Sequence, residues 1–204
     1  MAELTITTFL SLDGVMQAPG APNEDESNGF SHGGWVHPLF DEDVGREIVG
    51  IFSKADAFLL GRGTYDIFAA YWPRVTDPND PIAAKLNSLP KFVASRSRTA
   101  FAWSNSFPIL DVVREAAELK KRFPREVQVH GSPGLAQTLI RNGLIDEYRL
   151  FFFPVTLGSG KRLFGSGTIP RTLKLVRSRT TGRGVVMSVY RQAGGLKTGS
   201  FALD

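Results

Sequence analysis

The feature that most constrains this chain is an apolar stretch that breaks at glycines and continues in a helical pattern. Residues 57–60 read Ala-Phe-Leu-Leu, which has the length and composition of a buried strand. Gly61-Arg62-Gly63-Thr64 follows directly, and residues 65–72 then place apolar side chains at helical spacing. The stretch therefore predicts a strand, a tight turn and a helix, which is the repeating unit of α/β folds.

The turn at residues 61–64 has two interpretations. The first N–H groups of a helix lack acceptors within that helix, and the helix dipole makes this end positive, so it can bind an anion. Arg62 adds a planar cation that suits phosphate, and Thr64 adds a hydroxyl group. The turn is either a cradle for nucleotide phosphates or an ordinary connection with a surface arginine. Asp66 stands where a dinucleotide-binding fingerprint has its third glycine, so the motif alone does not decide.

Two further junctions of the same kind favour the phosphate cradle. The strand pattern of residues 126–130 runs into Gly131-Ser132-Pro133-Gly134-Leu135 and then a helix, and the short strand 92–94 ends in Ser95-Arg96. In open α/β sheets, ligands lie across the carboxyl ends of the strands. Three strand ends with small, hydroxyl or arginine side chains thus predict one phosphate-rich ligand.

The rest of the chain predicts an α/β domain over residues 1–193, followed by a loose tail over 194–204. Further strands are expected at residues 5–12, 101–103, 146–157, 173–180 and 185–191, and further helices at 41–54, 82–88 and 111–122. Residues 15–34 form a long loop of the kind that often covers a binding site. Because helices alternate with the early strands and the last two strands pair, we expect a three-layer fold with a mixed, mostly parallel sheet. A C-terminal antiparallel hairpin and helices on both faces complete it.

Composition narrows the function. The 204 residues contain no Cys, which excludes disulfides and thiolate chemistry and suits the cytoplasm. The net charge is +4, but the basic residues are spread, so we expect no nucleic-acid binding. No apolar run has the length of a membrane span, and the three histidines lack metal-ligand spacing. A mildly basic enzyme that binds anionic substrates explains this charge, and no metal site is expected.

In their order, these segments resemble the dihydrofolate-reductase-like fold. In detail they resemble the reductase domain of the riboflavin-biosynthesis deaminase/reductase proteins and its stand-alone relatives. The matching segments are Ser-Leu-Asp-Gly at 11–14, Gly-Arg-Gly-Thr-Tyr at 61–65, Ser-Arg at 95–96, Gly-Ser-Pro-Gly-Leu at 131–135, Gly-Leu-Ile-Asp-Glu at 143–147 and Leu-Gly-Ser-Gly-Lys-Arg-Leu-Phe at 157–164. The zinc motif of the deaminase is absent.

The resemblance implies that the chain binds NADPH and transfers a hydride to a small heterocyclic substrate. The residues that it assigns to the cofactor are Leu10, Gly61, Arg62, Thr64, Ser95, Arg96, Gly131, Ser132, Gly134 and Leu135. By the resemblance, residues 62, 95 and 96 lie near the 2′-phosphate, residues 131–135 hold the pyrophosphate and ribose, and Leu10 lies beside the nicotinamide.

Three residues are candidates for catalysis or substrate binding. Asp13 either positions substrate or water, or only bonds within its turn. His130 either donates a proton near neutrality, or only forms a hydrogen bond to the backbone at its strand end. Trp35 either stacks on a planar substrate ring or covers an edge of the core.

The resemblance favours 5-amino-6-(5-phosphoribosylamino)uracil reductase chemistry, with the physiological substrate left open. A dihydrofolate or pterin-type reductase is the alternative within the fold. A nucleotide-binding protein without catalysis and a non-nucleotide interaction module are the alternatives outside it. The apolar strand at 148–153 and the closing hairpin also predict a homodimer that buries part of this region.

Overall fold

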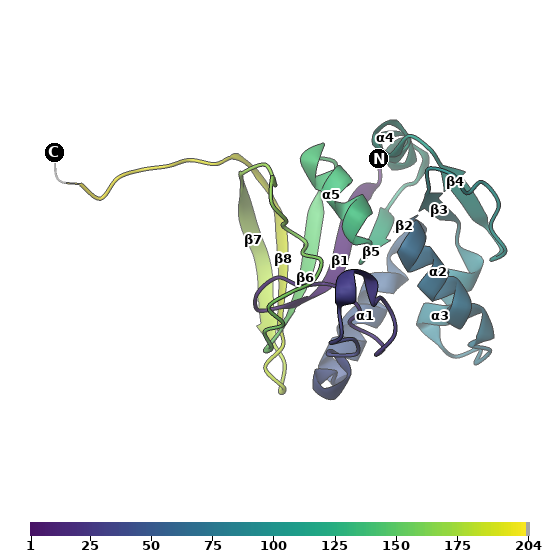
Figure 1. Ribbon diagram of the computed structural model, residues 1–204. Coiled ribbons are helices and arrows are strands. Elements are labelled where there is room, and N and C mark those ends of the chain that lie inside the picture. Colours follow the sequence, from purple (N-terminus) through teal and green to yellow (C-terminus); the bar gives the residue numbers. More distant parts are fainter. Residues whose placement is uncertain (203–204) are drawn as a thin grey trace.

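The computed structural model describes residues 1–202 and contains eight strands and five α-helices (Figure 1). The strands are β1 (Glu3–Ser11), β2 (Ala55–Gly61), β3 (Lys91–Ala94), β4 (Ser106–Ile109), β5 (Glu126–His130), β6 (Glu147–Phe153), β7 (Arg171–Thr180) and β8 (Val186–Gly195). The helices are α1 (Glu42–Ser53), α2 (Arg62–Tyr71), α3 (Pro81–Ser88), α4 (Val112–Arg122) and α5 (Pro133–Arg141). Short 3₁₀ turns lie at Ser27–Gly29, His37–Leu39 and Trp72–Arg74.

All eight strands form one sheet in the order β4-β3-β2-β5-β1-β6-β8-β7. The six strands from β4 to β6 are parallel, β8 is antiparallel to β6, and β7 is antiparallel to β8. The predicted fold class is therefore confirmed, including the antiparallel hairpin at the C-terminal end.

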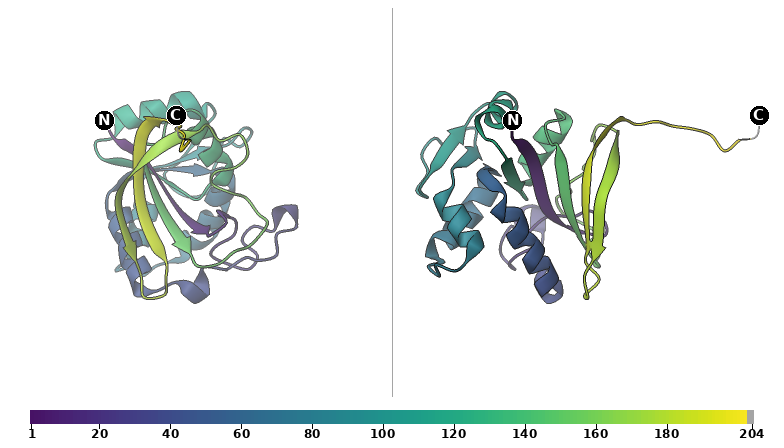
Figure 2. Two further views of the ribbon diagram at one scale, coloured as in Figure 1. Left: turned by 90° about the vertical axis from the view of Figure 1, so that its left-hand side faces the viewer. Right: turned by 180° about the vertical axis from the view of Figure 1, so that it is seen from behind.

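Helices cover both faces of the sheet (Figures 1 and 2). One face, called here the α1 face, packs against α1, α2 and α3 around a core that includes Phe58, Leu60 and Phe151. The other, called the α5 face, packs against α4 and α5 around a core that includes Leu59 and Val129. Helices on two faces follow from strands that are buried on both sides, such as β5, in which every residue is buried.

Helix boundaries follow local signals that the sequence carries. The Asp41 side chain accepts the N–H of Val44 and caps α1. The Asp111 side chain accepts the N–H of Arg114 and caps α4 in the same way. Helix α5 ends one residue before Asn142, and Gly143 then takes a positive φ of 62°.

The predicted strand at residues 101–103 is wrong, and β4 forms instead at Ser106–Ile109. The apolar run at 101–103 reflects burial of one side chain, because Trp103 is 5% exposed. The backbone N–H of Trp103 donates to the Tyr65 hydroxyl (3.1 Å) and not to a neighbouring strand, and Trp103 Nε1 donates to Asn87 Oδ1 (3.0 Å). Trp103 thus anchors the loop between β3 and β4 to α2 and α3.

The C-terminal hairpin is longer than its sequence pattern indicates. Strand β8 continues through Gly194 and Gly195, which the sequence places in the tail, because Gly195 pairs with Arg171 of β7. Residues 196–202 then leave the body without regular secondary structure (Figure 1). Within residues 1–202, no helix has both the length and the apolar character needed to cross a membrane.

Candidate functional site

The sheet order places a topological switch point at the carboxyl end of β5, and the region between the turns there is called here the crevice. Strands β1 and β2, the two neighbours of β5, lead into helices on the α1 face, whereas β5 leads into α5 on the opposite face. Chain connections that leave to opposite faces open a gap at the strand ends, and ligands of α/β sheets bind at such switch points. The Gly61–Thr64 turn and the Gly131–Leu135 turn therefore border the same crevice.

Ser132 joins these two turns directly. Its Oγ accepts the N–H of Gly61 (3.0 Å) and donates to the carbonyl of His130 (3.0 Å). Its own N–H donates to Thr64 Oγ1 (3.2 Å). The Ser132 hydroxyl is thus used inside the protein, and it fixes the N-terminal end of α2 against that of α5.

The close approach of the turns explains two of the glycines. Gly131 and Ser132 take positive φ angles of 53° and 58°, so the chain reverses sharply after β5. A Cβ atom on Gly61 would lie 3.3 Å from Ser132 Cβ and 3.6 Å from Leu135 Cβ. Glycine at position 61 therefore lets the turns meet, and serine at position 132 is held in a conformation that costs about 1 kcal/mol or more.

The two helices point free backbone donors into the crevice. Among the described residues, neither α2 nor α5 has a side chain that caps its first N–H groups. In α5 the first hydrogen bond within the helix runs from the Ala136 N–H to the Ser132 carbonyl (2.8 Å), so Gly134 and Leu135 precede it. Uncapped N–H groups and the positive ends of two helix dipoles together suit a ligand with two adjacent phosphates.

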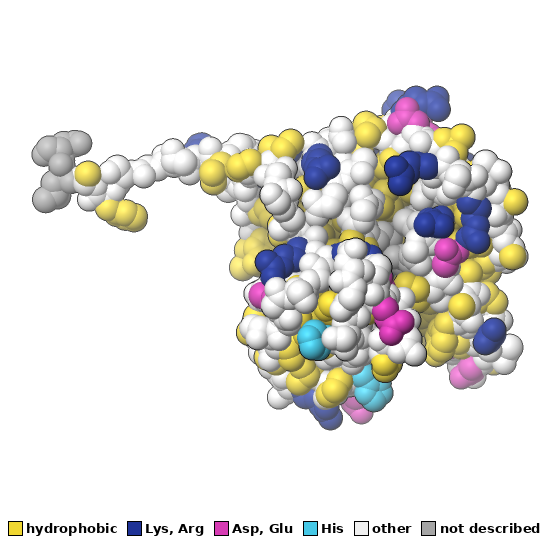
Figure 3. Space-filling model, in the orientation of Figure 1, with side chains coloured by type: hydrophobic (Ala, Val, Ile, Leu, Met, Phe, Trp, Pro, Cys, Tyr) yellow, Lys and Arg dark blue, Asp and Glu magenta, His cyan; other side chains and the backbone are white. Residues whose placement is uncertain are grey.

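The arginines and the serine at the ends of β2 and β3 lie side by side because these strands are neighbours. Ser95 Oγ accepts the N–H of Arg98 (2.9 Å), which closes the turn after β3. Within residues 1–202, Arg98 forms an ion pair with Asp66, whereas Arg62 and Arg96 are exposed and form no ion pair. Figure 3 shows Lys and Arg side chains gathered over this part of the surface. These two arginines are available to an anionic ligand.

Asp13 holds a loop. Its carboxylate accepts the Ser11 hydroxyl (2.7 Å) and the N–H groups of Leu157 (3.0 Å) and Gly158 (2.8 Å). The Ser11 hydrogen bond and then the Leu157 N–H lower the pKa of Asp13 to about 2. The ionised carboxylate thereby ties the end of β1 to the loop after β6.

His130 is buried on the α1 face, away from the phosphate turn that follows it. The residue is 6% exposed, and its ring stacks on that of Phe52 with centroids 4.3 Å apart. Its Nε2 lies 3.1 Å from Gln128 Oε1. Burial, and next the charge of Arg149, lower the pKa of His130 to about 3, so the ring is neutral at physiological pH. Strands β1 and β5 are neighbours, yet the structure does not bring the His130 and Asp13 side chains together. The geometry favours the structural alternative for His130, although its partner is an amide side chain and not the backbone.

Leu10 and Trp35 are also core residues. Leu10 is 1% exposed within the core of the α5 face. The Trp35 ring packs edge-to-face on Phe153 with centroids 5.7 Å apart, and its Nε1 donates to the carbonyl of Gln17 (2.8 Å). Trp35 therefore anchors the long loop between β1 and α1. Of its two interpretations, these contacts favour a residue that covers an edge of the core over one that stacks on a substrate ring.

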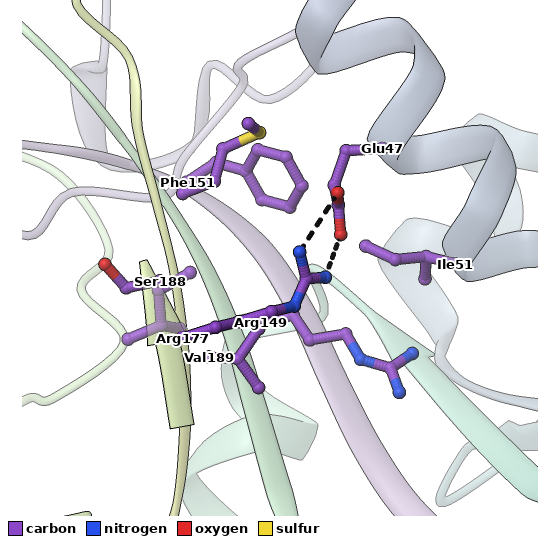
Figure 4. Close-up of a pocket in the computed structure, with 9 residues that line it drawn as sticks. Glu47, Ile51, Arg149, Phe151, Arg177, Ser188 and Val189 are labelled. Atoms are coloured by element: carbon purple, nitrogen blue, oxygen red, sulfur yellow. Dashed lines mark hydrogen bonds and ion pairs between the residues drawn. The ribbon is translucent and has the colours of Figure 1, made fainter. Parts of the chain in front are cut away.

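The sequence pattern missed a polar strip on the α1 face, made by Glu126, Gln128, His130, Glu147 and Arg149. Arg149 donates from both Nη atoms to Glu126 (2.7 and 2.9 Å) and from Nε to Glu147 (2.7 Å), reaching across β1. Gln128 Nε2 donates to Glu126 (2.7 Å). Figure 4 shows Arg149 beneath α1, beside the Glu47–Arg177 ion pair. The signal in the sequence that could have revealed this strip is the presence of charged residues within otherwise apolar strands.

The fold and its crevice define a dihydrofolate-reductase-like α/β protein. The model of the RibD C-terminal domain family matches residues 2–187, and the chain belongs to this family. It is similar to the uncharacterized protein YyaP of Bacillus subtilis (strain 168), with 32% identity over 158 residues. That alignment covers 76% of this chain and 83% of the relative.

Solved structures share the fold. A putative riboflavin biosynthesis protein from Shewanella sp. PV-4 has a TM-score of 0.72 and 22% identity, covering 95% of this chain and 99% of that one. A pyrimidine reductase-like protein from Corynebacterium diphtheriae has a TM-score of 0.58 and 14% identity, with coverages of 94% and 92%. The diaminohydroxyphosphoribosylaminopyrimidine deaminase/5-amino-6-(5-phosphoribosylamino)uracil reductase of Thermotoga maritima has a TM-score of 0.61 and 16% identity, and the match covers 94% of this chain and 57% of that one.

Proposed function

We propose that the chain is an NADPH-dependent reductase of a small heterocyclic substrate. The observation that carries this proposal is the contact through Ser132, which sets two uncapped helix N-termini beside one crevice. A dinucleotide has two adjacent phosphates, and each helix end can receive one of them. The family membership and the reductases among the solved relatives support the same chemistry.

The residues at the crevice fit the cofactor. The backbone groups of Gly134 and Leu135 would hold the pyrophosphate, and Thr64 can offer its hydroxyl hydrogen because Ser132 uses only the oxygen. Arg62 and Arg96 would hold the 2′-phosphate. The acidic group on that edge, Asp66, is already paired with Arg98, so it is not placed to receive a free ribose hydroxyl. When bound, the nicotinamide would supply the hydride.

The side chains around the crevice would orient the reactants and exclude water. Asp13 would fix the loop at the end of β1 beside the ring, as its contacts with Leu157 and Gly158 indicate. An anionic Asp13 and a neutral, buried His130 are poor proton donors. We therefore propose that solvent supplies the proton that the substrate gains.

Cofactor titration followed by fluorescence tests the binding site. We expect tighter binding of NADPH than of NADH, and loss of that preference in Arg62→Ala. Arg62→Ala removes one or two charge-assisted hydrogen bonds to the cofactor, each contributing roughly 1.5–3 kcal/mol to the binding free energy. The Kd for NADPH should therefore rise at least about 10-fold. Arg74→Ala is the matched control, since Arg74 is also exposed and follows the opposite end of α2. Equal affinities for the two cofactors would refute the assignment.

A nucleotide-binding protein without catalysis is the second candidate. The observation in its favour is that both acid–base candidates, Asp13 and His130, are engaged in internal contacts. A screen of heterocyclic substrates that follows the loss of NADPH absorbance separates the two functions. Turnover of any of them supports the reductase, whereas NADPH binding without turnover across pyrimidine and pterin substrates supports the second candidate.

A further inference from the structure

The carboxyl ends of β1 and β6 form the end of the crevice that the proposed cofactor phosphates do not use. This inference rests on the proposed function, in which the phosphates lie beside β2, β3 and β5. The sheet order β3-β2-β5-β1-β6 then places the substrate beside β1 and β6. Two loops lie there, residues 12–41 after β1 and residues 154–170 after β6, and Val15 forms a β-bridge with Arg162 between them. The region is called here the substrate end.

The cations at the substrate end already have partners within the protein. Lys161 Nζ lies 2.6 Å from a carboxylate oxygen of Asp25. Arg162 Nη2 lies 3.3 Å from a carboxylate oxygen of Asp13. Arg183, in the turn between β7 and β8, donates to a backbone carbonyl group. In the two loops and this turn, all within the described chain, each Lys and Arg therefore has an acceptor before any ligand binds.

The glycine-rich segment at residues 157–163 is not an open phosphate-binding loop. Its N–H groups at positions 157 and 158 donate to the Asp13 carboxylate (3.0 and 2.8 Å). The N–H at position 159 donates to the carbonyl at position 157 (2.9 Å), and the N–H at position 161 donates to Gln17 Oε1 (3.0 Å). A loop that binds phosphate needs N–H groups that point at the ligand. These N–H groups are used inside the protein, unlike those at the start of α2 and α5.

The two ends of the crevice carry opposite charge. Residues 13–34, at the substrate end, contain the four acidic residues Asp13, Glu24, Asp25 and Glu26 and no Lys or Arg. The turns at residues 61–66 and 95–98, at the cofactor end, contain three arginines and one aspartate. A site that sets negative charge against a negative ligand rejects that ligand, since like charges repel and neither gains a partner. The cofactor end therefore suits phosphate, and the substrate end does not.

We propose that the substrate is an uncharged heterocycle that carries no phosphate group. A phosphate at the substrate end would lose its water without gaining a free cation, or would have to break the Lys161–Asp25 or the Arg162–Asp13 pair. An uncharged heterocycle, with or without a sugar, meets neither cost. The phosphoribosyl substrate that the family resemblance favours does not meet this condition, so the chain would act on the unphosphorylated counterpart of such a compound.

Calorimetric titration of the full chain with matched ligands tests this proposal. The pairs are uridine with uridine 5′-monophosphate, and 5-amino-6-(ribosylamino)uracil with its 5′-phosphate. Saturating NADP⁺ fills the cofactor phosphate sites and prevents hydride transfer during the titration. We expect the unphosphorylated member of a pair to bind at least about 10-fold more tightly. Tighter binding of the phosphorylated member, or no binding by any of the four ligands, would overturn the proposal. Protein that binds neither NADPH nor NADP⁺ would instead refute the proposed function itself.

A charge variant tests the physical cause. Asp25→Asn removes the partner of Lys161, so the freed ammonium group should raise the affinity for the phosphorylated ligands about 10-fold. Glu26→Gln is the matched control, because Glu26 is exposed in the same loop and its loss removes a negative charge without freeing a cation. It should change that affinity by less than about 2-fold. Circular dichroism checks that both variants fold, and the comparison in the wild type stands without them. Equal gains in the two variants would overturn the assigned role of the Lys161–Asp25 pair.

Discussion

The crevice and the polar strip are both polar regions on β5, but they differ in how their polar groups are satisfied. In the strip, Arg149 pairs with Glu126 and Glu147, and Gln128 links this cluster to His130. In the crevice, the first N–H groups of α2 and α5 have no side-chain caps among the described residues. Polar groups that satisfy one another stabilise the fold, whereas groups left open are available to a ligand. Whether a polar group is satisfied within the protein therefore distinguishes a structural role from a binding role better than its residue type does.

The largest effect should come from breaking the strip. Arg149→Met leaves the buried carboxylate of Glu126 without its ion-pair partner, whereas Glu147 keeps its ion pair with Arg191. We expect a loss of about 3–5 kcal/mol in the free energy of unfolding, measured with urea. Arg141→Met, an exposed arginine on α5, should change it by less than about 0.5 kcal/mol. The folded fraction of the Arg149 variant should still bind NADPH. A variant that keeps its stability and loses only NADPH binding would contradict the assignment of the strip to stability and of the crevice to binding.

The next effect should come from the contact at Ser132. Ser132→Ala leaves the Gly61 N–H without its acceptor, which should cost about 1–3 kcal/mol of stability and weaken NADPH binding. Ser132→Gly removes the same hydroxyl but relieves the positive φ of 58°, so it should be more stable than the alanine variant. Ser104→Ala is the control at an exposed serine. If both Ser132 variants bind NADPH as tightly as the wild type, the contact does not align the helices for the cofactor.

Near neutral pH, the smallest effect should come from the titration of His130. Its folded pKa of about 3 lies below the ordinary value of 6.5, so between these values the unfolded chain binds more protons. The histidine therefore lowers stability as pH falls from 6.5, by up to about 1.4 kcal/mol per pH unit. His130→Gln should remove that part of the slope in urea unfolding at pH 4–7. It should leave the pH profile of turnover near neutrality unchanged, and a shifted turnover profile would restore His130 as a proton donor.

Short-range features of this protein could be predicted from the sequence alone. The Asp41 and Asp111 side chains cap helices by accepting hydrogen bonds from N–H groups three residues later in the chain. Gly143 ends α5 because it adopts a positive φ angle that a helix does not allow. The turns at residues 61–64 and 131–135 are local as well, because small residues and helical spacing follow a strand in both. These contacts form within one or two turns of the chain, so the order of residues determines them.

The tertiary structure decided which residues the turns bring together and which way the side chains point. Sequence places Gly61 and Ser132 71 positions apart, and only the order β2-β5-β1 lets them form a hydrogen bond. Register likewise sets His130 on the α1 face beside Phe52, and it lets Arg149 reach Glu126 across β1. Side chains alternate between the faces of a sheet, so burial and pKa at these positions depend on long-range pairing.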